Sequence, residues 1–229
     1  MSTLAAILQR HQDEFHQVIR FDPQKDRLYP FDLTSANPGL RESDIADTQR
    51  FTAYIEHTLQ STNASYGIGG YAEDRALYRR SPLFSGEEPR TVHLGIDIWG
   101  PAGTNVYAPM GGTVHSFAFN NAFGDYGATL VLSHQLDTRL FHTLYGHLAL
   151  NDINGLIEGK YISRGELIGH FGAPNENGNW PPHLHFQVIE DMRLWKGDYP
   201  GVCAPSEKAG YLANCPDPDL ILAMLKYTK

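Results

Sequence analysis

The sequence predicts a β-rich α+β fold in which antiparallel sheets form an open groove and helices come mainly from the N-terminal region. The first observation is that short apolar or alternating runs recur after Arg90, separated by Gly, Pro, Asn and Asp. Such runs are typical of antiparallel strands joined by turns. The second is that helical spacing occurs mainly before residue 60, with only short helices expected elsewhere.

The N-terminal region predicts two helices separated by an extended connection. Residues 3–20 form the first helix, with Ser2 or Thr3 as its cap. Its apolar residues at helical spacing are Leu4, Ile7, Leu8, Phe15, Val18 and Ile19. Residues 22–42 form the connection, and a second helix after Ser43 buries Ile45, Phe51, Ile55 and Leu59. Residues 61–90 are rich in loops, with a short helix from Glu73 to Arg79.

The remainder of the chain predicts strands followed by a tail. The runs expected as strands are VHLGIDIW, NVYAP, GTVHSFAF, GATLVLSH, FHTLYGHL, YISRG, ELIGHFG and HLHFQVIE. The tail from Lys196 is expected to be a loop, then a short helix after PDPD. We therefore divide the chain into an N-terminal extension of helices and loops (1–90), a core (91–195) and a C-terminal loop and short helix that packs on the core (196–229).

Composition and charge exclude several classes of protein. The formal net charge of −8 argues against nucleic acid as a partner. We find no signal peptide and no apolar stretch that could span a membrane. The expected compartment is the cytoplasm, or the periplasm or extracellular space if a signal has been removed. Cys203 and Cys215 are interpreted as free thiols, with one disulfide as the alternative in an oxidising compartment.

Three histidine motifs carry the chemistry. His183 and His185 lie two apart, so a strand would present both imidazoles on one face, with Cα atoms roughly 6.5–7 Å apart. His93 and Asp97 are four apart, and Gly95 between them could bend the strand enough to bring both to one ion. His147 follows Gly146 in a strand of aromatic and leucine residues. Taken singly, each motif has a simpler interpretation as ordinary structural residues.

Together and in this order, the three motifs resemble the M23 family of metallopeptidases, the lysostaphin-like or LytM-type zinc endopeptidases. The family pattern is H-x(3)-D, a Y-x-H-L strand, and H-x-H, found here as His93 with Asp97, the run YGHL at 145–148, and His183 with His185. GTNVYAPMGGTV, GDYGATLVLSH and ISRGELIGHFG are further family-like pieces. The resemblance spans about residues 90–190 and implies the duplicated-hybrid-motif type of fold seen in LytM and lysostaphin.

Carried over by position, the resemblance implies that His93, Asp97 and His185 ligate one Zn²⁺ per chain. His147 and His183 would be the unligated pair: one takes a proton from the catalytic water, and the other helps to stabilise the oxyanion. Two imidazoles and one carboxylate leave the fourth position of zinc open, as catalytic sites require. The sequence does not assign the two histidine roles. The expected substrate is a peptide or a peptidoglycan-derived compound, most directly a cross-link or a Gly-rich stem.

The chain also departs from the family pattern. The loop APNENGNWPP before the last motif is longer than the usual small turn, and we expect it to wall the groove. In latent members an upstream residue fills the fourth zinc position, for which Asn63, Glu73 and Asp74 are candidates, although a polar loop role is the simpler interpretation. Two alternative functions stay open: an inactive binding or regulatory module of the same fold, and a zinc amidase that acts on a small cytoplasmic metabolite. A cupin-type site would need a further histidine after His185, and none follows.

Overall fold

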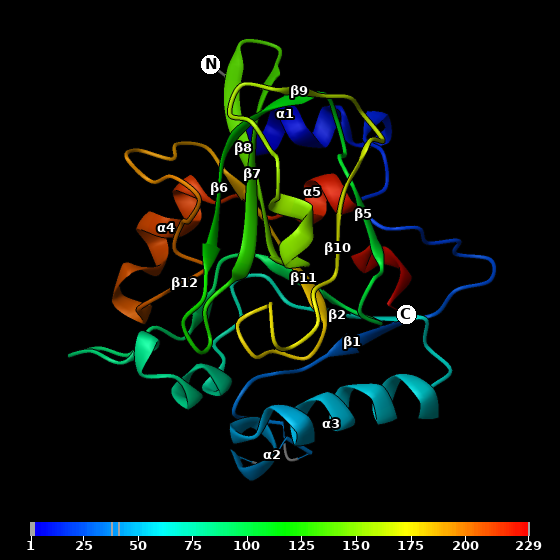
Figure 1. Cartoon of the computed structure of the whole chain (residues 1–229), viewed down its shortest axis with the longest axis vertical. Helices are drawn as coiled ribbons and strands as arrows, with labels where there is room; N and C mark the ends of the chain where they lie inside the picture. The colour runs from blue at the N-terminus through cyan, green and yellow to red at the C-terminus, as the bar shows by residue number, and fades with distance from the viewer. Residues whose placement is uncertain (1–2, 38, 41, 229) are drawn as a thin grey trace.

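The structure is a computed structural model that describes residues 3–37, 39–40 and 42–228 (Figure 1). Its largest element is an eight-stranded sheet in the order β1-β2-β4-β11-β8-β7-β6-β9. Neighbouring strands are antiparallel, except for the parallel pair β1 and β2. The strand bounds are β1 Leu28–Phe31, β2 Tyr66–Gly69, β4 Ile96–Trp99, β6 Gly112–Asn120, β7 Gly127–Leu136, β8 Arg139–Leu148, β9 Tyr161–Ile162 and β11 His183–Ile189. The predicted β-rich α+β class is confirmed.

Two small antiparallel sheets complete the β-structure of the described residues. Strand β5, Asn105–Tyr107, pairs with β10, Leu167–His170. Strand β3, Val92–His93, pairs with β12, Val202–Cys203. Each of the eight runs that the sequence predicts as strands after Arg90 contains a strand of the structure.

Strand β11 lies near the middle of the large sheet, between β4 and β8. Because side chains alternate along a strand, its residues divide into two sets. Leu184, Phe186 and Val188 are fully buried in the main hydrophobic core. His183 and His185 point to the opposite face, as the spacing of two residues predicts. The main core therefore lies behind the strand that carries both histidines and holds that strand in place.

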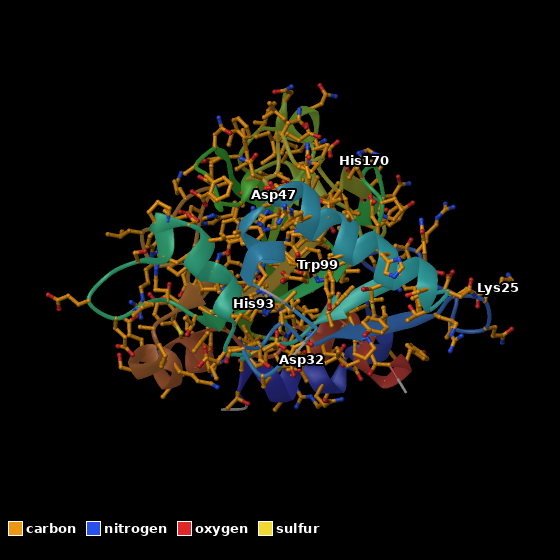
Figure 2. All side chains as sticks on the ribbon, turned by 90° about the horizontal axis from the view of Figure 1, so that it is seen from below. Lys25, Asp32, Asp47, His93, Trp99 and His170 are labelled. Atoms are coloured by element: carbon orange, nitrogen blue, oxygen red, sulfur yellow. The ribbon has the colours of Figure 1, made fainter. Side chains whose placement is uncertain are left out.

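The helices pack on different parts of the molecule. Helix α1, Leu4–Arg10, and helix α5, Asp219–Leu222, contribute to the main core. Helices α2, Glu42–Ala46, and α3, Thr48–Ser61, lie beyond β1 at one end of the molecule (Figure 1). Phe51 of α3 packs against Trp99 of β4, with ring centroids 5.8 Å apart. Figure 2, which views the molecule from below, shows Trp99 next to α3. The N-terminal region thus supports the end of β4.

The first predicted helix is too long. Helix α1 ends at Arg10, and a single 3-10 turn, Gln12–Glu14, follows it. From Phe15 the chain is extended along β5, where the Tyr107 N–H donates to the Val18 carbonyl. The Val18 side chain is buried in the main core although it lies outside the helix, so its helical spacing from the earlier apolar residues is coincidental. Thr3 caps the helix by accepting from the Ala6 N–H, whereas Ser2 lies outside the described residues.

Four further elements differ from the prediction. The connection 22–42 and the loop-rich segment 61–90 supply β1 and β2, which extend the large sheet at its edge. Pro30 argues against a strand when the sequence is considered alone, yet an edge strand such as β1 tolerates a residue that lacks an N–H. The short helix expected from Glu73 to Arg79 is a 3-10 helix, Ala76–Arg80. In the tail, helix α5 is confirmed, and α4, Lys208–Asn214, is an additional helix.

The two cysteines lie buried in the C-terminal segment as free thiols, as the sequence analysis prefers. Burial raises the pKa of each thiol to about 11, so both stay protonated at neutral pH. In the part of the chain that the structure describes, none of the helices has the length and apolar character needed to cross a membrane. The division of the chain at residues 90 and 195 stays a prediction.

His134 on β7 gives the fold a pH-dependent stability. Its imidazole is buried between the Gly111 carbonyl and the Thr143 hydroxyl, and burial lowers its pKa to about 4. The unfolded chain takes up this proton near pH 6.5, so stability is present above that pH and is lost as the pH falls toward 4. We expect urea titrations to show that His134→Gln loses less stability than the parent between pH 7 and pH 5, by about 2 kcal/mol. Equal losses in both proteins would contradict this.

Candidate metal centre

Three side chains from three strands meet at one point in the structure. The Nε2 atom of His93, the Oδ1 atom of Asp97 and the Nδ1 atom of His185 lie 3.0–3.2 Å from one another. All three residues are buried. Among the described residues, these are the ones whose histidine, cysteine or carboxylate atoms are grouped closely enough to hold a metal ion. The sequence-predicted ligand set is therefore brought together.

Strand pairing explains this convergence. Asp97 on β4 is directly opposite His185 on β11 in the antiparallel register. His93 lies on β3, and Leu94 and Gly95 separate β3 from β4. The predicted break at Gly95 is therefore present. It brings the His93 imidazole, four residues from Asp97, to the same side as that carboxylate.

In His93 and His185, the outer ring nitrogen, which points away from the three-atom cluster, has a hydrogen-bond acceptor. This acceptor determines which nitrogen of the ring carries the proton. His93 donates its Nδ1–H to the Gly70 carbonyl at 3.0 Å, and His185 donates its Nε2–H to the Gln187 side-chain oxygen at 3.0 Å. These assignments follow from the acceptors. In the neutral imidazoles the facing atoms, Nε2 of His93 and Nδ1 of His185, then carry lone pairs and no proton. Three acceptors thus converge with no hydrogen between them, an arrangement that a cation between them would stabilise.

The charge state of the centre also suits a divalent cation. Burial and the nearby Arg75 guanidinium lower the pKa of His93 to about 4. Burial alone would raise the pKa of Asp97, but His93 and Arg75 outweigh it and hold that pKa well below its usual range. At neutral pH His93 is therefore neutral and Asp97 is ionised. Metal ligands need these protonation states.

The donor set fits zinc. Two imidazole nitrogens and one carboxylate oxygen are usual zinc ligands, with bonds of about 2.0–2.2 Å. A tetrahedral ion with such bonds separates its ligand atoms by roughly 3.3 Å, close to the observed 3.0–3.2 Å. Each histidine also has an acceptor on its outer nitrogen, as metal-ligating histidines generally do.

His147 and His183 lie beside the three-residue cluster. Their ring centroids are 4.1 Å apart, and Nε2 of His183 is 4.0 Å from Oδ1 of Asp97. His183 donates its Nδ1–H to the Pro181 carbonyl, and His147 donates its Nδ1–H to the Asn177 carbonyl. Their Nε2 atoms are thereby left as acceptors. The sequence analysis placed both residues at this site, and the structure brings them there.

Two features hold these rings in position. The His183 ring stacks on Trp99, with centroids 4.0 Å apart and an interplanar angle of 18°. His147 has a backbone φ of 63°, in the left-handed region that residues other than glycine seldom adopt. Burial lowers the pKa of His183 to about 4, and burial with the adjacent His183 lowers the pKa of His147 well below its usual value. Both rings are therefore neutral at physiological pH.

Three residues of the site were missed by the sequence analysis. Arg75 donates to Oδ2 of Asp97 at 2.5 Å. The Tyr126 hydroxyl lies 3.4 Å from Nε2 of His185, and Gln187 accepts from that same nitrogen. Gln187 is two residues after His185, so the alternation along β11 could have identified it. Tyr126 lies in the family-like run GDYGATLVLSH, but the sequence analysis gave it no role, and Arg75 is distant in sequence from the histidine motifs.

The upstream residues considered as a fourth ligand have other roles or positions. Glu73 binds the Arg75 guanidinium through Oε2 at 2.5 Å, and its Oε1 accepts from the Leu33 N–H. Asn63 follows α3 in the left-handed conformation, where its N–H donates to the Gln60 carbonyl. Asp74 is exposed. None of the three belongs to the ligand group that the described residues form.

A groove leads to the cluster, and aromatic side chains form much of its wall. Asp97, His147, His183 and His185 lie at its base. The aromatic residues that line it are Tyr78, Phe84, Trp99, Tyr126, Trp180, Trp195 and Tyr199. Trp180 belongs to the loop APNENGNWPP, so this loop walls the groove as expected. Arg80 covers Trp180, with its guanidinium carbon 4.7 Å from the ring centroid.

Comparisons with known proteins agree with the motif analysis. Residues 91–196 match the model of peptidase family M23, a segment that includes all five residues His93, Asp97, His147, His183 and His185. The resemblance stated from the motifs is thereby confirmed. A search of the curated proteins finds no match.

Several solved structures are similar over part of the chain. A zinc-containing peptidase from Vibrio cholerae is 30% identical, covering 47% of this chain and 29% of that one, with a TM-score of 0.35. Csd3 from Helicobacter pylori is 22% identical, covering 62% and 35%, with a TM-score of 0.36. The catalytic domain of lysostaphin from Staphylococcus simulans is 19% identical, covering 68% and 94%, with a TM-score of 0.40. The chain thus spans only about a third of the first two proteins.

Gly95 offers a direct test of this geometry. A Cβ atom at Gly95 would lie 2.5 Å from Cε1 of His185 and 2.8 Å from the Phe186 carbonyl oxygen. We expect Gly95→Ala to lower the free energy of unfolding by about 1–3 kcal/mol and to weaken zinc binding, because the His185 ring must move. Denaturant unfolding and zinc titration measure the two effects.

Gly210→Ala is the matched control for this variant. Gly210 lies within α4, and a Cβ atom there meets no heavy atom within 4 Å. We expect it to leave zinc binding unchanged and to raise stability by about 0.5–1 kcal/mol. Parent-like zinc binding in Gly95→Ala would show that the His185 ring is not confined as the structure indicates.

Proposed function

We propose that this chain, whose residues 91–196 match peptidase family M23, is a zinc-dependent metallo-endopeptidase. It hydrolyses amide bonds in short peptides, and peptidoglycan cross-links or Gly-rich stems are the first substrates to test. The observation that carries the proposal is the convergence of three unprotonated acceptor atoms, from His93, Asp97 and His185, beside two neutral imidazoles at the base of a groove.

In this proposal His93, Asp97 and His185 hold one zinc ion. When bound there, zinc lowers the pKa of a water molecule and polarises the amide carbonyl. The protein fixes the two imidazole ligands through their outer nitrogens, so that neither ring has to reorient during the reaction. The walls of the groove restrict bulk water around the reacting groups.

His147 and His183 supply the acid and base function. Because their Nδ1–H groups bind carbonyl oxygens, both Nε2 atoms accept a proton in the neutral state. Either imidazole can take the proton of the attacking water at Nε2 and then deliver it to the leaving amine. Because neither neutral Nε2 atom carries a hydrogen, the oxyanion role that the resemblance implies for the second histidine would require that imidazole to be protonated. Both histidines are kept as candidates for the base.

A zinc amidase acting on a small molecule is the second candidate. The aromatic walls of the groove favour it, because Trp180 and Trp195 enclose space beside the cluster. An inactive binding module is less well supported, because every predicted ligand and both free histidines are present. A panel of muropeptides and small amides separates the two enzymatic candidates, since a metabolite amidase leaves cross-linked wall peptides intact.

We expect purified protein to contain about one zinc per chain, measured by plasma mass spectrometry. Asp97→Ala removes a ligand and is expected to lose the metal. His183→Ala is expected to keep the metal and to lose hydrolysis of muropeptides by roughly 10²- to 10⁴-fold, as the removal of an acid–base group does. Release of new amines measures the activity, and a chelator should abolish it reversibly.

His115→Ala is the matched histidine control. His115 lies on β6, where it contacts Ser116 and His142 and none of the five site residues in the described contacts. It should retain both zinc and activity. A parent protein that takes up no zinc after addition and dialysis would contradict the proposed enzyme and favour the binding module. Full activity in His183→Ala would leave His147 as the base.

A further inference from the structure

Arg75 is a fully buried arginine on the outer side of the metal-ligand cluster. Its side chain is 1% exposed. It precedes the 3-10 helix Ala76–Arg80 and lies outside the segment that matches the family. Its guanidinium makes four contacts: Nη1 with Oδ2 of Asp97 at 2.5 Å and with the Tyr78 hydroxyl at 3.3 Å, Nε with Oε2 of Glu73 at 2.5 Å, and Nη2 with the Gly70 carbonyl at 3.3 Å.

The two oxygens of Asp97 therefore have different partners. Oδ1 faces the imidazoles, 3.2 Å from Nε2 of His93 and 3.1 Å from Nδ1 of His185. Oδ2 is bound by Arg75. A carboxylate can bind a cation through one oxygen or through both. The arginine occupies the oxygen that would make the second bond.

Glu73 makes this arrangement electrostatically acceptable. An arginine so close to a divalent cation would repel it if its charge were uncompensated. The Glu73 carboxylate lies on the other side of the guanidinium and compensates that charge. Gly70 also connects Arg75 to the proposed ligand His93, because its carbonyl accepts from both side chains.

We propose that Arg75 is a positioning residue that makes Asp97 a one-oxygen ligand and so keeps a coordination position open for water and the substrate carbonyl. This inference rests on the proposed zinc site. It extends that site to a residue outside the family match. An arginine that only stabilises the fold by pairing with a buried carboxylate would make the same contact, so the coordination number of the bound metal is the measurement that separates the two roles.

Cobalt(II) in place of zinc reports the coordination number, because four-coordinate cobalt absorbs visible light more strongly than five- or six-coordinate cobalt. We expect the parent protein to give the strong four-coordinate spectrum. In Arg75→Gln, Asp97 is free to bind through both oxygens, so the absorption per bound cobalt should fall. Zinc affinity, measured by competition with a chelator, should also fall roughly 10- to 100-fold, as for other residues that orient ligands.

Arg80→Gln is the matched control, because it removes another largely buried arginine from the same stretch of chain. Arg80 contacts Thr48, Asn179 and the Trp180 ring, and none of its described contacts reaches Asp97. It should keep the parent cobalt spectrum even if its melting temperature falls. A parent-like spectrum in fully loaded Arg75→Gln would overturn the proposal, whatever the affinity of that variant.

A crystal structure of the zinc-loaded native chain tests the proposal without any variant, and so stands even if Arg75→Gln does not fold. Asp97 bound through Oδ1 alone, with Oδ2 on Arg75, supports the proposal. Both oxygens at bonding distance from zinc overturn it. A native chain that binds metal but fails this test contradicts only the role of Arg75. A native chain that binds neither zinc nor cobalt contradicts the proposed function as well.

Discussion

The antiparallel pairing of β11 with β4 is the contact on which the rest of the site depends. It places His185 opposite Asp97 and His183 opposite Trp99, at alternate positions of one register. A shift by one residue would turn both histidines into the main core and expose Leu184 and Phe186 instead. Burial of those apolar side chains therefore fixes the register, and the register fixes the geometry of the proposed metal ligands.

The compensation of charge is the second constraint. A buried carboxylate is costly unless it is paired and hydrogen-bonded. Asp97 meets this need through the Arg75 guanidinium on Oδ2, while its Oδ1 faces the two unprotonated imidazole nitrogens. The guanidinium in turn pairs with Glu73. By holding Oδ2, Arg75 also leaves Oδ1 directed toward the point where the histidine nitrogens converge. The contact that makes the buried carboxylate tolerable in the fold therefore also orients it for metal binding.

The sequence was sufficient for the parts of the structure that depend on short-range patterns. The strands after Arg90, the shared face of His183 and His185 and the break at Gly95 all follow from alternation and glycine chemistry over a few residues. The N-terminal region was predicted less well. Phe15 and Val18 continue the helical spacing of α1, yet they lie in an extended segment because β5 offers backbone hydrogen bonds. Arg75 precedes Asp97 by 22 residues, and only the fold brings the two side chains into contact. Patterns over a few residues therefore could not identify it.

The position of Arg75 outside the family match also bears on how such a chain can evolve. The segment 91–196 is the part of the chain that matches the family model. In this protein, residues before 91 supply the last two strands at one end of the large sheet, the aromatic support behind Trp99 and a partner for Asp97. A gene fusion with its breakpoint at residue 90 would transfer all five histidine and aspartate residues of the motifs and still leave their surroundings behind. The part of the chain that builds the site is therefore longer than the segment that matches the family.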